Sequence, residues 1–200
     1  MKVDKCNLKI NIFVPVFNRS KITKRFIENI HKQSFTNFNL YIIDDKSEDD
    51  TPKIVRKFSA HDKRINLIRT KGDSWWAGSI AYGLKKIFDK GLINSTDYVA
   101  FMNDDISFEK TLFHDLLAVL KNNPEKIISP VRVNNKKIIS SGSKIICWPL
   151  AISSRPLKGR LFSRDKSQPL VDIDFIGANC TIFPGKLINE IGYPNFMKFP

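Results

Sequence analysis

A chain of 200 residues, 42% of them hydrophobic and 26% charged, is long enough to bury a core and has the composition of one ordinary globular domain. No apolar run reaches the roughly 20 residues that a membrane-spanning helix needs, and the opening residues, MKVDKCNLKI, do not form a secretory signal. Cys6, Cys147 and Cys180 are too few and too widely spaced for a disulfide framework or a CxxC metal pair. We therefore expect a protein of a reducing compartment, the cytoplasm.

The formal net charge of +13 indicates an anionic partner, and the candidates are nucleic acid, a membrane surface and a phosphorylated substrate. Neither zinc-finger spacing nor an RNA-recognition aromatic motif is present, so we expect no nucleic acid. The cations are dispersed except in one basic stretch, which comprises Arg155, Lys158, Arg160, Arg164 and Lys166. This stretch is either a solvated mobile loop or a peripheral contact with the inner face of an anionic membrane.

The chain begins with an alternation of strand and helix patterns. Residues 8–16 (LKINIFVPV) are apolar and β-branched and predict a buried strand. Ser20 is placed to cap a helix with an apolar stripe at Ile22, Phe26, Ile27 and Ile30. Residues 39–43 predict a second strand, which an acidic loop follows.

The alternation continues to about residue 120. Thr51 and Pro52 are a favourable helix start, and residues 65–68 and 98–102 predict further strands. Two more helical faces are spaced as amphipathic helices: Ile80, Leu84, Ile87 and Phe88, and then Leu112, Phe113, Leu116, Leu117 and Leu120. This order predicts an α/β fold with a mostly parallel central sheet flanked by helices. After about residue 126 the pattern changes to short strands, so we expect a first half at 1–125 and a second half at 126–200.

Unusual polar segments follow three of the predicted strands, where ligands bind in open α/β sheets. They are PVFNR at 15–19, DDKSEDDT at 44–51 and NDD at 103–105. The acidic loop at 44–51 is open to a second interpretation, as a solvated cap of the next helix. Adjacent carboxylates such as Asp104 and Asp105 repel each other unless a cation or a basic partner neutralises them, and oxygen ligands of this type suit Mg²⁺ or Mn²⁺. A helix cap formed by Asp105 is the alternative.

Four segments in this order resemble the motifs of family 2 glycosyltransferases, enzymes with the Rossmann-like GT-A fold. They are PVFNRS, YIIDDKSEDDT, GDSWWAGSIAYG and FMNDD, with a weaker similarity at FIGANCTIF. The WWAGS segment resembles bacterial enzymes that transfer rhamnose or related sugars to cell-surface polysaccharides. The resemblance implies a role in the biosynthesis of the bacterial cell envelope.

The resemblance also implies where the donor binds. Pro15 and the stretch Phe17, Asn18 and Arg19 would line the base and ribose of the nucleotide. Asp44 would accept a hydrogen bond from a pyrimidine base, which makes UDP or dTDP the expected nucleotide, and Asp45 would support that loop.

The DxD-type metal motif of the family would correspond to Asp104 and Asp105. The resemblance implies that Asp105 is the direct ligand of Mn²⁺ or Mg²⁺ and that Asp104 lies nearer the ribose. Trp75, Trp76 and Gly78 would lie where the chain passes close to the donor. The paired indoles of Trp75 and Trp76 are equally typical of a core, a lid or a sugar platform.

The catalytic base is the missing part of the pattern. Inverting members of the family place it in an acidic motif after the strand that GANCTIF resembles, and this sequence ends at Pro200, about where that motif would begin. We therefore expect the base beyond Pro200 and regard the second half as truncated; Asp174 is a weak substitute.

The expected function is transfer of a sugar, with inversion, from a UDP- or dTDP-sugar to a glycan or a polyprenyl-linked acceptor. A catalytically inactive nucleotide-sugar-binding fragment is the non-enzymatic alternative. A sugar-phosphate nucleotidyltransferase is less favoured, because its glycine-rich loop after the first strand is replaced by VFNRS. Dinucleotide dehydrogenases are excluded because no GxGxxG follows a strand.

Overall fold

The computed structural model describes residues 8–140, 142–150, 152–163, 170–177 and 179–192. These described residues fall into two compact units, one within residues 8–128 and 182–192 and the other between residues 129 and 181. We call them the sheet unit and the hairpin unit. Cys6, Arg164, Lys166 and Pro200 lie outside the described residues.

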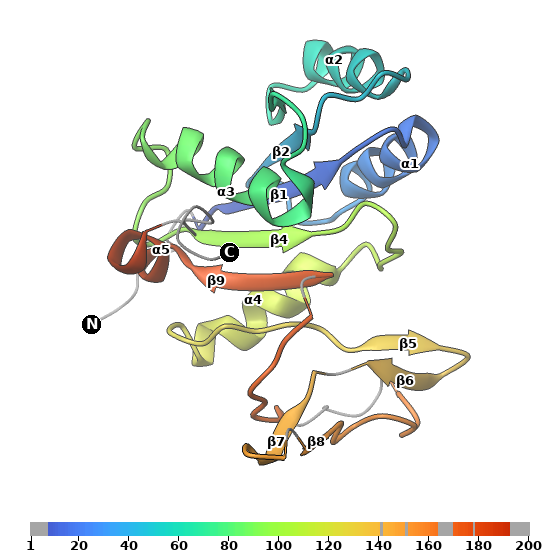
Figure 1. The fold of residues 1–200 in the computed structure, drawn as a ribbon, viewed down its shortest axis with the longest axis vertical. Helices are drawn as coiled ribbons and strands as arrows, with labels where there is room; N and C mark the ends of the chain where they lie inside the picture. The colour runs from blue at the N-terminus through green and yellow to red at the C-terminus, as the bar shows by residue number, and fades with distance from the viewer. Residues whose placement is uncertain (1–7, 141, 151, 164–169, 178, 193–200) are drawn as a thin grey trace. The chain divides into compact units, whose positions relative to one another are not determined.

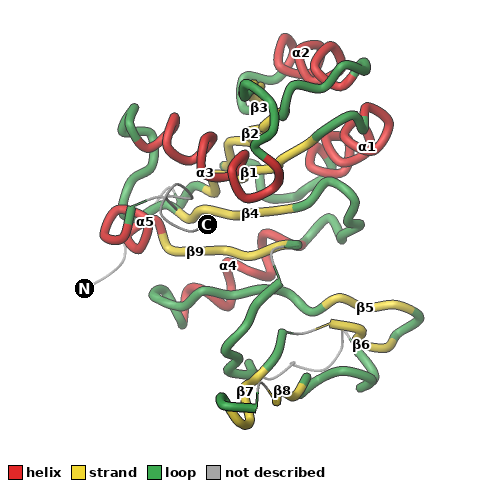
Figure 2. Tube along the Cα trace, viewed as in Figure 1, coloured by secondary structure: helices red, strands yellow, loops and turns green. Residues whose placement is uncertain are grey.

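The sheet unit is built around a five-stranded sheet in the order β3-β2-β1-β4-β9 (Figures 1 and 2). The pairs β1–β2, β2–β3 and β1–β4 are parallel, while β9 runs against β4 in Figure 1. Its strands are β1 (Ile10–Val16), β2 (Phe38–Asp44), β3 (Ile65–Arg69), β4 (Tyr98–Met102) and β9 (Cys180–Pro184). The predicted α/β fold with a mostly parallel central sheet is confirmed.

Helices connect the strands and cover the sheet. They are α1 (Ser20–His31), α2 (Thr51–His61), α3 (Trp75–Phe88), α4 (Leu112–Asn122) and the short α5 (Gly185–Ile191). Alternate residues of the strands face opposite sides. Phe13, Tyr41 and Ile43 belong to a buried cluster with Ile80 and Leu84 of α3. The other side is packed too, since Phe38 of β2 lies 6.4 Å, centroid to centroid, from Phe113 of α4.

The start of α1 differs from the expectation. The helix begins at Ser20 itself. The N-cap residue is Arg19, and its side chain makes no hydrogen bond with the first turn. Instead the backbone N–H of Ser20 donates to Oδ2 of Asp49 at 3.0 Å. The prediction that Ser20 is the cap was therefore wrong, because a carboxylate from the next βα loop supplies the acceptor.

The hairpin unit contains two small antiparallel pairs. One joins β5 (Arg132–Asn134) to β6 (Lys137–Ser140), and the other joins β7 (Lys144–Cys147) to β8 (Ile152–Ser154). Residues 155–163, predicted as part of a mobile loop, are bonded to β6 through the pairs Ile138 N–Arg160 O and Gly159 N–Ile138 O, at 2.9 and 2.8 Å. That segment is therefore a turn held by the β6 backbone.

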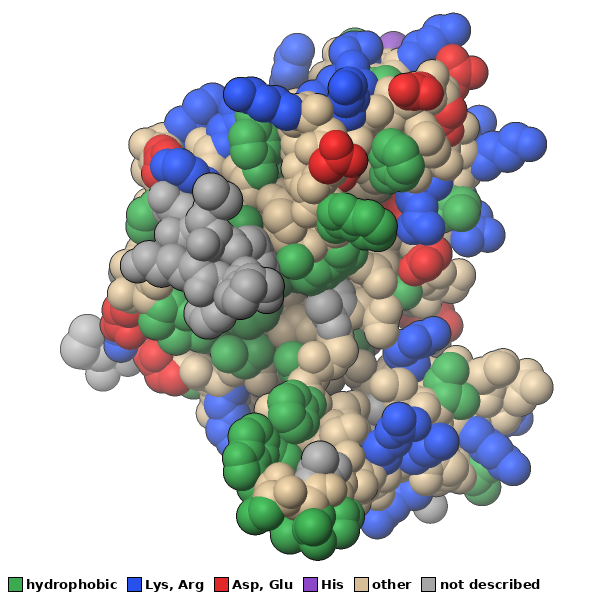
Figure 3. Space-filling model, in the orientation of Figure 1, with side chains coloured by type: hydrophobic (Ala, Val, Ile, Leu, Met, Phe, Trp, Pro, Cys, Tyr) green, Lys and Arg blue, Asp and Glu red, His purple; other side chains and the backbone are tan. Residues whose placement is uncertain are grey.

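The described helices include none long and apolar enough to cross a membrane. Lys and Arg side chains are spread over the face drawn in Figure 3, in keeping with the formal charge of +13.

Candidate active site at the carboxyl edge of the sheet

The loops that follow β1, β2 and β4 meet at one edge of the sheet, because the three strands are parallel neighbours. The structure thereby brings together the predicted residues at 15–19, 44–49 and 103–105. Hydrogen bonds between residues that are 29 to 85 positions apart in the sequence join these loops.

The loops after β1 and β2 form one hydrogen-bonded body. The N–H of Asn18 donates to Oγ of Ser47 at 2.9 Å, and the side-chain oxygen of Asn18 accepts from the N–H of Glu48 at 2.8 Å. Asn18 has a φ of 49°, a left-handed conformation that asparagine tolerates better than most residues. Its amide oxygen is thus occupied within the protein.

Asp49 connects two helix starts, and the sequence did not reveal its link to the first of them, α1. Its carboxylate accepts from the N–H of Ser20 in α1 and, at 2.9 Å, from the N–H of Thr51 in α2. Burial raises the pKa of Asp49, but the hydrogen bonds from Thr51 and Ser20 outweigh it and hold the pKa below its usual value. The acidic loop is therefore in part a helix cap, as the alternative interpretation held.

Asp44 is completely buried at the end of β2. Nε of Arg69, the last residue of β3, donates to its Oδ2 at 2.7 Å, and the N–H of Ser47 donates to its Oδ1 at 3.2 Å. Arg69 was not among the predicted site residues, since nothing in a strand-ending arginine indicates a partner 25 positions earlier. The pairing orients the carboxylate and leaves a cation beside it.

Asp45 organises the start of α3. It accepts hydrogen bonds from the hydroxyl of Thr70 and from the N–H groups of Ser74 and Trp75, both at 3.0 Å. Trp75 has a φ of 54°, which is unfavourable for a bulky residue, and its side chain is 82% exposed. The expected support by Asp45 is thus directed to the segment that carries both tryptophans.

Asp104 is 1% exposed and bonded through both oxygens. Arg19 donates to Oδ1 at 2.5 Å, and the hydroxyl of Thr23 donates to Oδ2 at 2.8 Å. Burial raises the pKa of Asp104 despite these bonds. In this arrangement Asp104 holds Arg19 across the ends of β1 and β4, and its oxygens are not open to a cation.

Asp105 is different, because its side chain is 52% exposed and its Oδ2 lies 3.9 Å from the guanidinium of Arg19. The next helix, α4, begins at Leu112 with Thr111 at its N-cap, so Asp105 is not a helix cap. Among the described residues no three His, Cys, Asp or Glu side chains gather as a metal cage. One open carboxylate still fits Mg²⁺ or Mn²⁺, because these ions commonly take one or two carboxylates and fill their shell with water and substrate phosphate.

The remaining predicted residues border the same edge. Nε1 of Trp76 donates to the side-chain oxygen of Asn103 at 2.8 Å, which joins the start of α3 to the end of β4. Phe17 is 57% exposed, while Pro15 and Gly78 are partly buried.

Asp174, the weak candidate for the catalytic base, belongs to the hairpin unit. It is exposed, and its Oδ2 accepts from the N–H of Ile145 in β7 at 2.7 Å. This bond gives the carboxylate a structural partner.

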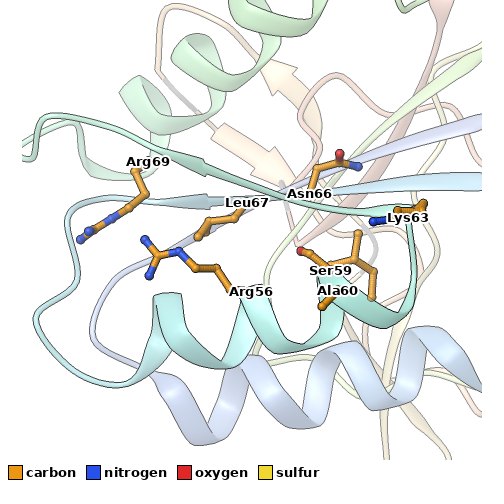
Figure 4. Close-up of a pocket in the computed structure, with 8 residues that line it drawn as sticks. Arg56, Ser59, Ala60, Lys63, Asn66, Leu67 and Arg69 are labelled. Carbon is orange, nitrogen blue, oxygen red and sulfur yellow. The ribbon is translucent and has the colours of Figure 1, made fainter.

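A separate hollow of about 540 Å³ lies between α2 and β3. In Figure 4 the side chains of Arg56 and Arg69 extend to the same end of it, and Lys63 lies at the other end. It shares Arg69 with the strand-end cluster but contains none of the carboxylates. The strand-end cluster is therefore the better candidate for chemistry.

The fold is an α/β domain with a polar cluster at the carboxyl ends of its parallel strands. Residues 11–187 match the family model described as Glycosyl transferase family 2, so the chain belongs to that family.

Curated relatives are similar over part of their length. The chain is 32% identical over 116 residues to an uncharacterised glycosyltransferase of Rickettsia bellii, a match that covers 58% of this chain and 16% of the relative. It is 28% identical over 98 residues to the GalNAc(5)-diNAcBac-PP-undecaprenol beta-1,3-glucosyltransferase of Campylobacter jejuni, covering 48% and 29%. The chain therefore spans much less than the full length of these relatives.

Solved structures share the fold. The mannosyltransferase PcManGT of Pyrobaculum calidifontis, solved with GDP-Man and Mn²⁺, aligns with a TM-score of 0.60 at 13% identity, over 92% of this chain and 46% of that one. TarS 1–349 of S. aureus in complex with UDP-GlcNAc aligns with a TM-score of 0.56 at 16% identity, over 92% and 47%. At this identity the likeness concerns the fold, and it agrees with the expected GT-A architecture.

Proposed function

We propose that the chain is the donor-binding part of an inverting glycosyltransferase that uses a UDP- or dTDP-sugar and a divalent cation. The observation that carries this proposal is the difference between two adjacent carboxylates: Asp104 is buried and paired with Arg19, while Asp105 is open at the same strand end. Asp104 fixes the position of Arg19, while Asp105 is available to bind a cation. This arrangement suits a diphosphate that binds together with a divalent cation.

Each residue then has a definite task. The Asp44 carboxylate, oriented by Arg69, accepts from the ring N–H of a pyrimidine. Asp105 holds Mn²⁺ or Mg²⁺, which when bound neutralises charge on the departing diphosphate. Arg19, 3.9 Å from Asp105, contributes a second positive charge at that position. The loops after β1 and β2, joined through Asn18 and Asp49, keep the base and diphosphate positions at a fixed separation.

The acceptor is proposed to be a glycan or a polyprenyl-linked sugar on the cytoplasmic side of the membrane. The relative in Campylobacter jejuni, whose name describes an undecaprenol-linked acceptor, supports this class of acceptor. The segment WWAGS suggests that the transferred sugar is rhamnose or a related sugar, and a dTDP-sugar would be the corresponding donor.

Calorimetry of the chain with UDP, dTDP, GDP and ADP, each with Mn²⁺, tests the proposal. We expect UDP or dTDP to bind about tenfold more tightly than the purine nucleotides, a difference of about 1.4 kcal/mol. Tighter binding of GDP or ADP would overturn the role of Asp44. The GDP-Man in the mannosyltransferase complex makes GDP the critical comparison.

A second measurement separates an enzyme from an inactive binder. Hydrolysis of the bound nucleotide sugar, followed as release of the nucleoside diphosphate, is expected to be slow but dependent on Mn²⁺. Binding without any release would favour the inactive nucleotide-sugar-binding fragment.

A further inference from the structure

The hairpin unit carries apolar side chains where a soluble protein usually has polar ones. Ile146, Trp148 and Leu150 are 66%, 73% and 69% exposed. Along β7, Lys144 and Ile146 alternate with the more buried Ile145 and Cys147, so they share its outer face. Trp148, Pro149 and Leu150 then form the turn before β8. We call Ile146, Trp148 and Leu150 the apolar tip.

The surface beside the apolar tip is also apolar. Ile152 and Phe175 are 46% and 54% exposed. With Ile145, Trp148 and Ser153 they line a hollow of about 260 Å³. Figure 3 shows apolar side chains gathered over this part of the hairpin unit, with Lys and Arg side chains over its other part. A contiguous exposed apolar patch of this kind marks an interaction surface.

The charge of the same unit selects the partner. Residues 129–181 contain nine Lys or Arg and three Asp, a formal charge of +6. Lys144, Arg155, Lys158 and Arg160 are all exposed. A second copy of the chain would present the same positive charge, which opposes self-association. An anionic lipid surface offers both what the tip needs, an apolar interior, and what the cations need, negative headgroups.

We propose that the apolar tip inserts into the interface of an anionic bilayer while exposed cations of the same unit contact the headgroups. Trp148 suits this position, because an indole places an apolar body and a polar N–H at the boundary between hydrocarbon and water. The contact would hold the protein beside a lipid-linked acceptor; in that respect the inference rests on the proposed function, but lipid binding itself does not require a donor.

The test is cosedimentation with vesicles of phosphatidylcholine alone or with phosphatidylglycerol, at about 0.05 and about 0.5 M NaCl, on either side of physiological screening. The apolar variant is Ile146→Ser with Trp148→Ser and Leu150→Ser. Its matched control is Leu92→Ser with Ile191→Ser, two exposed apolar residues of the sheet unit. The charge variant is Arg155→Gln with Lys158→Gln and Arg160→Gln. Far-UV circular dichroism checks that each variant is folded.

We expect the wild type to bind anionic vesicles at low salt and the apolar variant to bind about tenfold more weakly, with the control within about twofold of the wild type. The charge variant should lose the preference for anionic lipid. The tryptophan fluorescence of the wild type should shift to shorter wavelength when the protein binds anionic vesicles, and Trp148→Phe should abolish this shift.

Three outcomes would overturn the proposal. They are no binding by the wild type, equal binding by the apolar variant, and sedimentation of the wild type as a dimer that the apolar variant abolishes, which would make a second copy the occupant. Nucleotide calorimetry on the apolar variant keeps the two hypotheses apart. Lipid binding without nucleotide binding would contradict the proposed function alone, and nucleotide binding without lipid binding would contradict this inference alone.

Discussion

Asp105 and Asp49 are both exposed carboxylates at the carboxyl edge of the sheet, yet they have different partners. Asp49 holds the N–H groups of Ser20 and Thr51, while Asp105 has an open side chain near Arg19. Asp49 is therefore a structural carboxylate, whereas Asp105 is available to a cation.

We predict that Asp105→Ala abolishes the stimulation of nucleotide binding by Mn²⁺ and leaves the unfolding midpoint nearly unchanged, because the side chain is 52% exposed and lies 3.9 Å from its cationic neighbour Arg19. Asp49→Ala should keep much more of the stimulation and lower stability by about 1 kcal/mol, the usual cost of a lost helix cap. Calorimetry with and without Mn²⁺ and urea unfolding measure the two effects. Identical behaviour of the two variants would show that the metal position is misassigned.

Asp62, between α2 and β3, gives a prediction for pH. Hydrogen bonds from the Arg64 side chain, at 2.7 Å for Nη2, are the main reason that its pKa is lowered to about 2, and His31 adds a contact at 3.1 Å. A lowered carboxyl pKa stabilises the fold above the unfolded value near 4, and this contribution is lost as the pH falls through the folded value.

Asp62→Asn should therefore destabilise the protein by about 1 kcal/mol at pH 7, a figure reduced for solvent screening. The difference from the wild type should shrink between about pH 4 and about pH 2. Urea unfolding at pH 7, 4 and 3 measures it, with the exposed Asp50→Asn as control. A difference that is constant with pH would show that the ion pair is not its cause.

At the scale of elements, α3 approaches β2 closely at Gly83. A Cβ built on Gly83 would lie 2.6 Å from Cδ1 of Ile43, whereas one on Gly78 would meet only Cβ of Ser74, at 3.3 Å. Both glycines lie within α3, where alanine is intrinsically preferred by about 1 kcal/mol.

We predict that Gly83→Ala lowers stability by about 1–3 kcal/mol, the range for overpacked cores. Gly78→Ala should leave stability equal or slightly higher, and it should weaken nucleotide binding if the donor passes this turn. Thermal unfolding and calorimetry of the pair measure both effects. Equal loss of stability in the two variants would contradict the close packing of α3 on Ile43.

The elements could be predicted well where local sequence decides them. The strand at Tyr98–Met102 is predicted to the residue, because five buried apolar residues are bounded by polar ones. The start of α1 could not be predicted, since its acceptor, Asp49, lies 29 positions further along.

The sequence predicted which residues lie at the candidate site, but it did not predict which side chains pair with one another. Parallel strands bring their ends to one edge, so Asn18, Asp45 and Asp104 could be placed together. Local pattern does not record that Asp104 is paired with Arg19, 85 positions earlier, or that Asp44 is paired with Arg69. These pairs depend on side-chain geometry that only the assembled sheet fixes.

At the scale of the whole molecule, the hairpin unit is inserted between two adjacent points of the sheet unit. Ile128 and Ile182 exchange backbone hydrogen bonds of 3.0 and 2.8 Å, so the chain leaves and re-enters the sheet unit at one place. The predicted boundary at residue 126 lies near the point where the chain leaves the sheet unit. The prediction did not include the return of the chain to the sheet unit at Ile182.

Replacing residues 131–178 with a Gly-Ser linker of about four residues should therefore preserve the sheet unit, because short loops can close paired chains at little entropic cost. We expect one cooperative urea transition and nucleotide affinity within about threefold of the full chain. Loss of cooperative unfolding would show that residues 129–181 are needed for the fold of the sheet unit.

The same insertion has a consequence for biosynthesis. β4 leaves the ribosome roughly 80 residues before its neighbour β9, which at about 5–20 residues per second is a delay of several seconds. During that interval one edge of an entirely apolar strand has no hydrogen-bonding partner, a state that promotes aggregation. Slow translation or a lack of chaperones should therefore reduce the yield of this protein through nascent chains whose sheet is still one strand short.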